Sequence, residues 1–393
     1  MVGAMNIGFL SPSLSRVLGG IFEIERDLAL ALDALPDTRV TAYGLMDHET
    51  ANDAPAWRHI PCHVGAIRGV RAFGYSPQLR AIMARADEDI LHLHSLWTYT
   101  SVLALAWKQR TGRPYVTTAN GMLEPWALNN SVLKKRAAAL FYERRALRAL
   151  GCLHVNTVSE LESARAFGLQ GPFCIIPNGV ALPGPVSMDK APTVVRSIRA
   201  AGGQIMLQLG RLHPKKNIAA AIEAFAQVAP AHPNWHFVIA GWGDDGYRKA
   251  LEQQAQNSQV ASRIHFAGPV FGEEKAATLA AANAFILASH SEGFPMAILE
   301  AFANALPVIM TRHCNLHSGF DIGAAIDVGP KAHEIARGMA DMLAASDQDR
   351  RAMGAKGRGL VEQRFSWNHV AQDMRAVYAW LLGGGSPPAS VVS

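Results

Sequence analysis

The stretch QIMLQLGRLHPKKNIAAAIEAF, residues 204–225, has the pattern of one strand followed by one helix. Residues 204–209 are mostly apolar and predict a buried strand, while Gly210 and Pro214 predict a loop after it. A helix is expected to begin near Asn217. A strand, a loop and a helix in this order form the repeating unit of a parallel α/β sheet.

The same alternation of short aliphatic runs and longer helical patterns continues from one end of the chain to the other. This order is typical of doubly wound parallel sheets. Helices are expected at 101–111, 132–150, 159–168 and 366–382. Strands are expected at 6–11, 39–43, 89–94, 114–118, 152–157 and 174–177 in the first half, and at 204–209, 236–240, 264–266, 284–287, 307–310 and 324–328 in the second.

The length and the linker signal divide the chain into two domains. Its 393 residues suit two domains, and the prolines and glycines between 181 and 203 indicate a linker. We therefore expect an α/β protein of two Rossmann-like, doubly wound parallel-sheet domains that face each other across a cleft, with ligands at the carboxyl ends of the strands. The expected parts are a first domain at 1–180, onto which the helix 366–382 packs back, a linker at 181–203, a second domain at 204–365 and a flexible tail at 383–393.

The composition excludes several classes of protein. Hydrophobic residues make up 49% of the chain and charged residues 18%, which excludes a disordered chain. The formal net charge of +5 suits acidic ligands or a membrane surface but is too small to indicate nucleic-acid binding. The four cysteines lie far apart, which argues against disulfides and zinc and favours a cytoplasmic protein. The longest apolar stretch, 276–288, is too short to span a bilayer.

The stretch SHSEGFPMAILEAFANALPVI, residues 289–309, predicts an anion-binding helix start. Pro295 suits the first turn of a helix, and the backbone N–H groups at a helix start bind anions. Glu292 in the preceding loop and Glu300 within the helix offer carboxylates to sugar or ribose hydroxyls. In the alternative interpretation they are a surface residue and a helix-capping residue.

The loop after the strand at 204–209 carries three basic residues, Arg211, Lys215 and Lys216. Cations beside a helix start, at the carboxyl end of a strand, suit a diphosphate group because backbone donors and fixed positive charges then act together. The alternative is a solvated basic loop.

Gly19 and Gly20 lie between the first strand and its helix, where glycine lets the backbone approach a ligand closely. The chain contains neither the G-x-G-x-x-G fingerprint nor the P-loop motif. Nicotinamide and P-loop chemistry therefore both lose support.

The segment GWGDDGY, residues 241–247, places two carboxylates next to each other at a strand end. They suggest either a metal site or a helix cap. Because a helix is expected to follow directly, we favour N-capping by Asp244 over metal ligation.

Taken in order, these pieces resemble the retaining nucleotide-sugar glycosyltransferases of family four, which have the glycosyltransferase-B fold. The resemblance covers nearly the whole chain, and it is the order and spacing of its fragments that make it specific. The fragments are the Gly19-Gly20 loop, HLHSLW at 92–97, TTANGMLEPWAL at 117–128, IPNGV at 176–180, GRLHPKK at 210–216, GWGDDG at 241–246, FAGPVFG at 266–272, the Glu-x7-Glu pair and FSWNHVAQDM at 365–374.

The resemblance implies a role for each matching residue. Arg211 and Lys216 look like the pair that neutralises the donor diphosphate, and Glu292 like the carboxylate that holds hydroxyls of the transferred sugar. Glu300 looks like the ribose ligand. The other implied donor-binding residues are Gly19, Gly20, Asn120, Gly210, Val270, Gly293, Phe294, Pro295, Met296 and Leu299. The resemblance implies no cofactor and no metal, since two cations beside a helix start do the electrostatic work of a magnesium ion.

One departure from the family lies in the first domain. The family often carries a His-Gly pair after the fourth strand, whereas this chain has Asn120-Gly121. Asn120 forms hydrogen bonds but carries no positive charge, which puts a proton-transfer role in doubt. His94 and Trp97 are the candidates that face the acceptor, with a structural role for His94 as the alternative.

The expected helix at 132–150 is basic as well as apolar. Leu140, Phe141 and Leu147 lie among Lys134, Lys135, Arg136, Arg144, Arg145 and Arg148. Such a face suits an anionic membrane or a lipid-diphosphate acceptor. The alternative is a solvated helix whose charges form salt bridges with Glu143.

The family resemblance leads to a functional hypothesis. It implies a metal-independent, retaining hexosyltransferase that uses a nucleotide diphosphate sugar and a glycan or lipid-linked acceptor, in bacterial exopolysaccharide, lipopolysaccharide or glycolipid synthesis. The expected location is the cytoplasm, peripheral at the inner membrane face, with no nucleic-acid partner. A nucleotide-sugar epimerase of the same fold and a non-catalytic sugar-nucleotide binding protein remain as alternatives.

Overall fold

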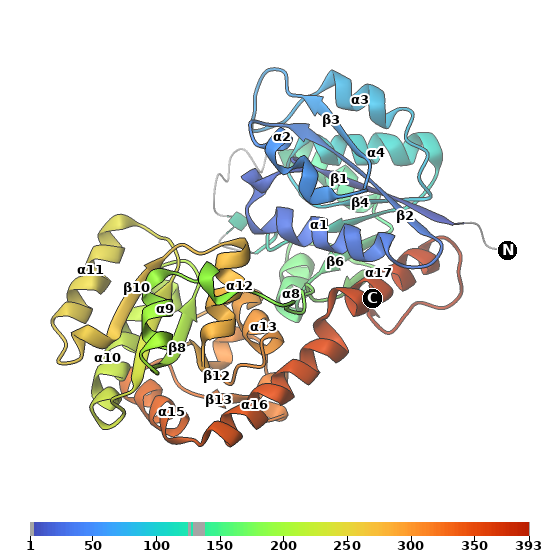
Figure 1. The fold of residues 1–393 in the computed structure, drawn as a ribbon. Coiled ribbons are helices and arrows are strands. Elements are labelled where there is room, and N and C mark those ends of the chain that lie inside the picture. Colours follow the sequence, from blue (N-terminus) through green and yellow to red (C-terminus); the bar gives the residue numbers. More distant parts are fainter. Residues whose placement is uncertain (1–3, 125–126, 129–137, 393) are drawn as a thin grey trace. The chain divides into compact units, whose positions relative to one another are not determined.

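The computed structural model describes residues 4–124, 127–128 and 138–392. The chain forms two compact units (Figure 1). Unit 1 consists of Met1–Gly179 together with Trp367–Ser393, and unit 2 consists of Val180–Ser366. In the part of the chain that the structure describes, no helix combines the length and the apolar character that crossing a membrane requires.

Unit 1 is built on one eight-stranded sheet in the order β14-β7-β6-β5-β4-β1-β2-β3. All neighbouring strands are parallel except the pair β14 and β7, which is antiparallel. The strands are β1 (Met5–Ser11), β2 (Thr38–Met46), β3 (Cys62–Ala66), β4 (Ile90–Leu93), β5 (Tyr115–Thr118), β6 (Cys152–Val155), β7 (Phe173–Ile175) and β14 (Val391–Val392).

Unit 2 is built on a six-stranded sheet in the order β10-β9-β8-β11-β12-β13, in which all pairs are parallel. Its strands are β8 (Gln204–Leu209), β9 (Trp235–Ala240), β10 (Ile264–Gly268), β11 (Ala284–Leu287), β12 (Val308–Met310) and β13 (Ala325–Asp327). A strand was expected at each of these places. The predicted fold class, two Rossmann-like parallel-sheet domains, is confirmed.

Helices follow the strands in both units. In unit 1 the helices given for the described residues are α1 (Gly20–Asp33), α2 (Thr50–Asp53), α3 (Pro77–Met83), α4 (Tyr99–Thr111), α7 (Arg144–Arg148), α8 (Val158–Ala166) and α17 (Trp367–Leu381), and a π-helical turn, Ala139–Glu143, precedes α7. In unit 2 they are α9 (Thr193–Ala200), α10 (Ile218–Val228), α11 (Asp245–Gln256), α12 (Gly272–Ala281), α13 (Met296–Ala303), α14 (Ser318–Asp321), α15 (Ala332–Ala344) and α16 (Asp347–Leu360).

The structure differs from the sequence-based boundaries at the expected linker. Residues 181–203 contain α9, whose Val195 and Ile198 are buried in the hydrophobic core of unit 2. The prolines and glycines mark only the ends of this segment, because the apolar side chains between them pack as a helix face. The segment is part of unit 2.

The tail also differs from its prediction. Within 383–393, expected to be flexible, β14 adds a strand to the edge of the sheet of unit 1, with Val391 opposite Cys174. A pair of valines after a run of glycine and proline is too short for a pattern to indicate a strand. Strand β3 was missed because it is an edge strand with only one buried residue, Gly65.

A chain of hydrogen bonds ties α17 to the sheet of unit 1. His154 Nε2 donates a hydrogen bond to the Ile176 carbonyl at 2.8 Å. Because the other nitrogen of a neutral imidazole carries no proton, His154 Nδ1 accepts a hydrogen bond from the Thr118 hydroxyl at 2.9 Å. The Thr118 oxygen then accepts from His92 Nε2 at 2.6 Å, and the Tyr378 hydroxyl donates to His92 Nδ1 at 2.5 Å. Burial lowers the pKa of both histidines, so they act as neutral hydrogen-bonding groups that hold the last helix.

Glu25 is a buried acid on α1, and its burial makes the stability of the protein depend on pH. Burial raises the pKa of its carboxyl group to about 8, an effect partly offset by the Ser11 hydroxyl. The folded state therefore holds a proton that the unfolded state releases above about pH 4.5. The contribution of Glu25 to stability is fully present below that pH and is lost as the pH rises through about 8.

We predict that Glu25→Gln gains stability relative to the wild type as the pH rises from about 4.5 to about 8, by about 1.4 kcal/mol per pH unit. Urea unfolding of both proteins across this range gives the difference in unfolding free energy. Glu23→Gln, at an exposed position of the same helix, is the matched control and should show no such trend. A difference for Glu25→Gln that does not depend on pH would contradict the burial argument.

Candidate functional site

Lys216 and Glu292 meet at the carboxyl edge of the sheet of unit 2. They follow β8 and β11, which are hydrogen-bonded neighbours. Lys216 Nζ lies 2.7 Å from Glu292 Oε1, and the exposed fractions of the two side chains are only 19% and 9%. Two predicted site residues that lie far apart in the sequence thus form one partly buried ion pair.

The backbone around Lys216 explains how its side chain is held. Lys216 ends a short 3-10 helix, Pro214–Lys216, and Asn217 follows in the left-handed conformation with φ 57°. The Asn217 side chain donates to the carbonyls of Ala288 at 3.1 Å and Pro330 at 2.7 Å. Asparagine tolerates this conformation and fastens the loop to the end of β11.

Two glycines let β8 and β9 approach each other at the same edge. Gly210 has φ 147° and Gly241 has φ 154°. A Cβ atom at Gly241 would lie 1.8 Å from the Gly210 carbonyl oxygen, a distance no side chain can satisfy. The close approach therefore requires glycine at Gly241, whereas Gly210, an expected donor-binding residue, contributes its backbone carbonyl to this contact.

Neighbouring loops hold Glu292 in place. Its carboxylate accepts from the Ser289 hydroxyl at 2.5 Å, its backbone N–H donates to the His313 carbonyl at 3.0 Å, and its own carbonyl accepts from Asn315 Nδ2 at 2.6 Å. Sequence reasoning missed Ser289 and Asn315. Ser289 belongs to the same motif as Glu292, so the sequence could have indicated it as a partner. Asn315 comes from the loop after β12, and the motif gives no signal of its contact.

Glu300 pairs with a lysine that the sequence analysis did not single out. Glu300 Oε1 on α13 lies 2.8 Å from Lys275 Nζ on α12. The two helices follow β10 and β11, so this ion pair joins two helices that begin after the carboxyl ends of these strands. A lysine in an ordinary helix pattern gives no signal of such a contact.

The other expected donor-binding residues around α13 lie at its start. Gly293, Phe294 and Met296 are half-buried, whereas Pro295 and Leu299 are buried. The Met296 N–H donates to the Phe294 carbonyl and the Ile298 N–H to the Pro295 carbonyl. Pro295 is the N-cap residue of α13, directly before its first helical residue.

Arg211 is an exposed cation at this edge. It lies in the loop after β8, and no ion pair of Arg211 occurs among the described residues. Lys215 in the same loop is exposed as well. The loop that carries Lys216 therefore presents two further positive charges to an anion.

In the segment at Val270, a buried residue is followed by an exposed one. Val270 itself is buried in the hydrophobic core of unit 2. Its neighbour Phe271 is 59% exposed and contacts Trp242, which is 50% exposed, with 5.5 Å between the ring centroids. Trp242 follows β9 and Phe271 follows β10, so the two rings form an exposed aromatic pair at the same carboxyl edge.

Asp244 caps a helix. Its Oδ1 accepts the backbone N–H of Tyr247 at 2.9 Å, at the start of α11. The capping prediction is confirmed. Within the described ranges, no cluster of three or more histidine, cysteine, aspartate or glutamate side chains has an arrangement that could hold a metal ion.

The candidates of unit 1 lie at the carboxyl ends of its strands. Gly19 has φ 61°, and a Cβ atom at Gly19 or Gly20 would meet open space. Asn120 has φ 47°, and its buried side-chain nitrogen has no hydrogen-bond partner in the described part of the chain. These residues follow strands β1 and β5 of the same sheet.

The two expected acceptor residues differ in their surroundings. His94 is 1% exposed, and burial lowers its pKa to about 3, so its ring is neutral. The backbone N–H of Trp97 donates to Glu143 Oε2 at 2.9 Å, and the Tyr142 hydroxyl donates to the Trp97 carbonyl at 2.7 Å. His94 thus belongs to the interior of unit 1, whereas Trp97 is half-buried and its backbone is held by Glu143 and Tyr142.

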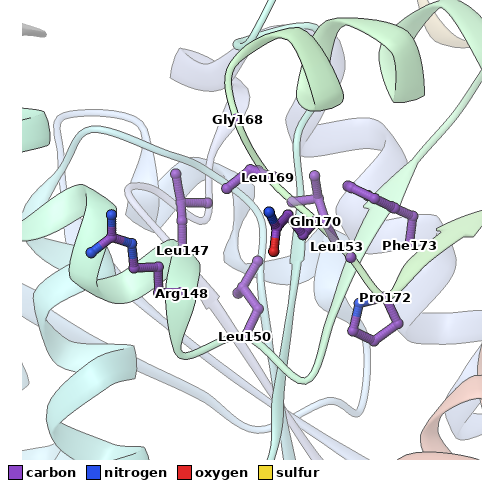
Figure 2. Close-up of a pocket in the computed structure, with 10 residues that line it drawn as sticks. Leu147, Arg148, Leu150, Leu153, Gly168, Leu169, Gln170, Pro172 and Phe173 are labelled. Carbon is purple, nitrogen blue, oxygen red and sulfur yellow. The ribbon is translucent and has the colours of Figure 1, made fainter. Parts of the chain in front are cut away.

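A pocket of about 410 Å³ lies elsewhere in unit 1. Figure 2 shows leucine side chains gathered around Gln170, with Arg148 pointing away from them. The lining residues are Leu147, Arg148, Leu150, Leu153, Gly168, Leu169, Gln170, Gly171, Pro172 and Phe173. It contains none of the expected site residues.

Two family models match successive parts of the chain. Residues 20–179 match the model described as a glycosyl transferase 4-like domain, and residues 195–360 match the model described as glycosyl transferases group 1. Together the two matches extend over most of both units.

Curated relatives and solved structures are similar to this chain. Alpha-monoglucosyldiacylglycerol synthase of Streptococcus pneumoniae is 37% identical over 108 residues, which are 28% of this chain and 24% of that protein. Phosphatidyl-myo-inositol mannosyltransferase of Mycobacterium tuberculosis is 25% identical over 77% of each chain. The structure of Anabaena HepE in complex with UDP and glucose has a TM-score of 0.71 and 20% identity, and covers 94% of this chain and 98% of its own.

Proposed function

Since this chain belongs to the family-four-like glycosyltransferases of the glycosyltransferase-B fold, we propose that it moves a hexose from a nucleotide diphosphate sugar to a glycan or lipid-linked acceptor with retention of configuration. The observation that carries the proposal is the ion pair of Lys216 and Glu292 beside the exposed Arg211. Cations suit the diphosphate, and a carboxylate suits the sugar hydroxyls.

The donor is proposed to lie along the carboxyl edge of the sheet of unit 2. Lys216 and Arg211 neutralise the diphosphate. When Lys216 binds the diphosphate, its ion pair with Glu292 weakens, and Glu292 accepts hydrogen bonds from sugar hydroxyls. Glu300 accepts from the ribose. HepE is described in complex with UDP and glucose, which makes uridine diphosphate sugars the first donors to test.

In the proposed reaction, the acceptor hydroxyl attacks the anomeric carbon from the side that the diphosphate leaves. The new bond joins the acceptor oxygen to the anomeric carbon while the bond to the phosphate oxygen breaks. The acceptor proton passes to an oxygen of the departing phosphate. The protein positions the reactants and stabilises the negative charge on the leaving group, which Lys216 and Arg211 do without a metal in this proposal.

The acceptor is proposed to be carbohydrate or lipid-linked and to bind unit 1. The names of two relatives support this class, since one is a glucosyldiacylglycerol synthase and another a phosphatidyl-myo-inositol mannosyltransferase. We place the reaction in bacterial glycolipid, lipopolysaccharide or exopolysaccharide synthesis.

We predict that Lys216→Ala lowers kcat about 100- to 1000-fold, because the loss of one preorganised charge partner raises the barrier by about 2.7–4 kcal/mol. Transfer is measured as nucleotide release with a uridine diphosphate sugar and a lipid or glycan acceptor. EDTA should leave the wild-type rate unchanged.

Two controls make this result interpretable. Thermal unfolding verifies that Lys216→Ala is folded, and Lys249→Ala, an exposed lysine on α11, should keep the wild-type rate. A wild-type rate for Lys216→Ala would contradict its role. Conversion of the donor to an epimer without acceptor would favour the epimerase, and binding of donor without any nucleotide release would favour the binding protein.

The base of the donor is proposed to stack on the Trp242–Phe271 pair. Both rings are exposed at the ends of neighbouring strands, and β9 lies next to β8, which carries the diphosphate loop. Stacking of a base on an aromatic ring is worth about 1–3 kcal/mol.

We predict that Trp242→Ala weakens the binding of uridine diphosphate about 5- to 150-fold in calorimetry. Trp242→Phe, which keeps an aromatic ring, should lose much less. Inorganic diphosphate has no base, so its affinity should be the same for the wild type and Trp242→Ala. An equal loss for inorganic diphosphate would show that the substitution damages the loop rather than a stacking contact.

A further inference from the structure

Two large apolar side chains stand out from unit 1 at Leu140 and Phe141. Their exposed fractions are 76% and 79%. They belong to the π-helical turn Ala139–Glu143, which continues into α7, and the exposed side of α7 carries Arg144 and Arg145. The opposite side, including Ala146 and Leu147, is buried. Exposed apolar residues and arginines therefore share one side of this helical segment.

A second exposed segment lies next to the first. Val70 is 71% exposed and is followed by the exposed Arg71. Phe73, in the same loop, contacts Tyr142 of the helical segment, with 5.6 Å between the ring centroids. This aromatic contact brings the loop and the helical segment together in one region of unit 1.

Three arginines of this region form no ion pair within the described residues. None of Arg71, Arg144 and Arg145 forms an ion pair in the ranges 4–124, 127–128 and 138–392. Glu143 is turned inward instead, where Oε2 accepts a hydrogen bond from the backbone N–H of Trp97 at 2.9 Å and Oε1 accepts one from the Ser101 hydroxyl at 3.1 Å. The expected salt bridges to Glu143 are therefore wrong for these arginines. Lys134, Lys135 and Arg136 lie outside the described residues.

We propose that this region docks unit 1 on an anionic phospholipid surface. The docking patch is defined as Val70, Arg71, Leu140, Phe141, Arg144 and Arg145. Its three apolar side chains insert at the boundary between headgroups and acyl chains, and its arginines bind the phosphates of the headgroups. The patch gives the protein a membrane attachment that goes beyond sugar transfer itself.

The composition of the patch favours lipid over a protein partner. The patch has only three exposed apolar side chains, far fewer than the roughly 20–30 residues that each partner contributes to a stable protein interface. Unpaired arginines around them would repel a second copy of the same patch. Anionic lipid complements the charge, and each arginine near such a surface contributes about 1 kcal/mol.

The test is binding of the full chain to lipid vesicles in a sedimentation assay, without donor or acceptor, so that its outcome is independent of the proposed transfer. Vesicles of phosphatidylcholine alone are compared with vesicles that also contain phosphatidylglycerol. We expect binding to the mixed vesicles only, and weaker binding at higher salt. Phe141→Ser and the double variant Arg144→Gln, Arg145→Gln should each weaken it about tenfold or more.

Matched controls separate the patch from general surface properties. Val158→Ser removes another apolar side chain of unit 1, which is 58% exposed, and Arg351→Gln removes an exposed arginine of α16 in unit 2. Both should bind vesicles as the wild type does. Thermal unfolding verifies that each variant is folded.

Three results would overturn the proposal. The first is no binding of the wild type to the mixed vesicles, and the second is binding that the patch variants leave unchanged. The third is a dimer in sedimentation velocity that Phe141→Ser dissociates, which would assign the patch to a second copy of the chain.

Discussion

The pairing of β8 with β11 is the constraint on which the candidate site depends. Because these strands are parallel neighbours, the loops that follow them end at the same edge, and Lys216 comes within 2.7 Å of Glu292. Asn217 fastens the first loop to the end of β11, and Ser289 and Asn315 hold the second. The fold therefore brings both side chains to one edge of the sheet, and in the proposed function a positive charge held there stabilises the leaving group.

In unit 1 the buried polar groups hold the fold together through hydrogen bonds. His92 and His154 are neutral links in a chain of hydrogen bonds that ends at Tyr378 on α17. Glu143, which follows the exposed Phe141 by two positions, is turned inward to bind backbone and hydroxyl groups. Because Glu143 is turned inward, Arg144 and Arg145 form no ion pair among the described residues, and the positive charge of the proposed docking patch follows from this.

Sequence patterns predicted the parts of this structure that depend on local order. The alternation of strands and helices gave the two sheets, and the strand–loop–helix units placed Lys216 and Glu292 at strand ends. Patterns failed where a contact depends on packing between distant segments. The pairing of Glu300 with Lys275, the short strand β14 and the burial of Val195 in α9 each need a partner that comes from elsewhere in the chain.

We propose that the edge formed by β8 and β11 binds the diphosphate of a sugar donor. The decisive experiment is a crystal structure of the full chain with bound uridine diphosphate. We expect phosphate oxygens within hydrogen-bonding distance of Lys216 Nζ and the Arg211 guanidinium, with Glu292 left to face the sugar. A diphosphate bound elsewhere, with Lys216 and Glu292 still paired at 2.7 Å, would contradict it.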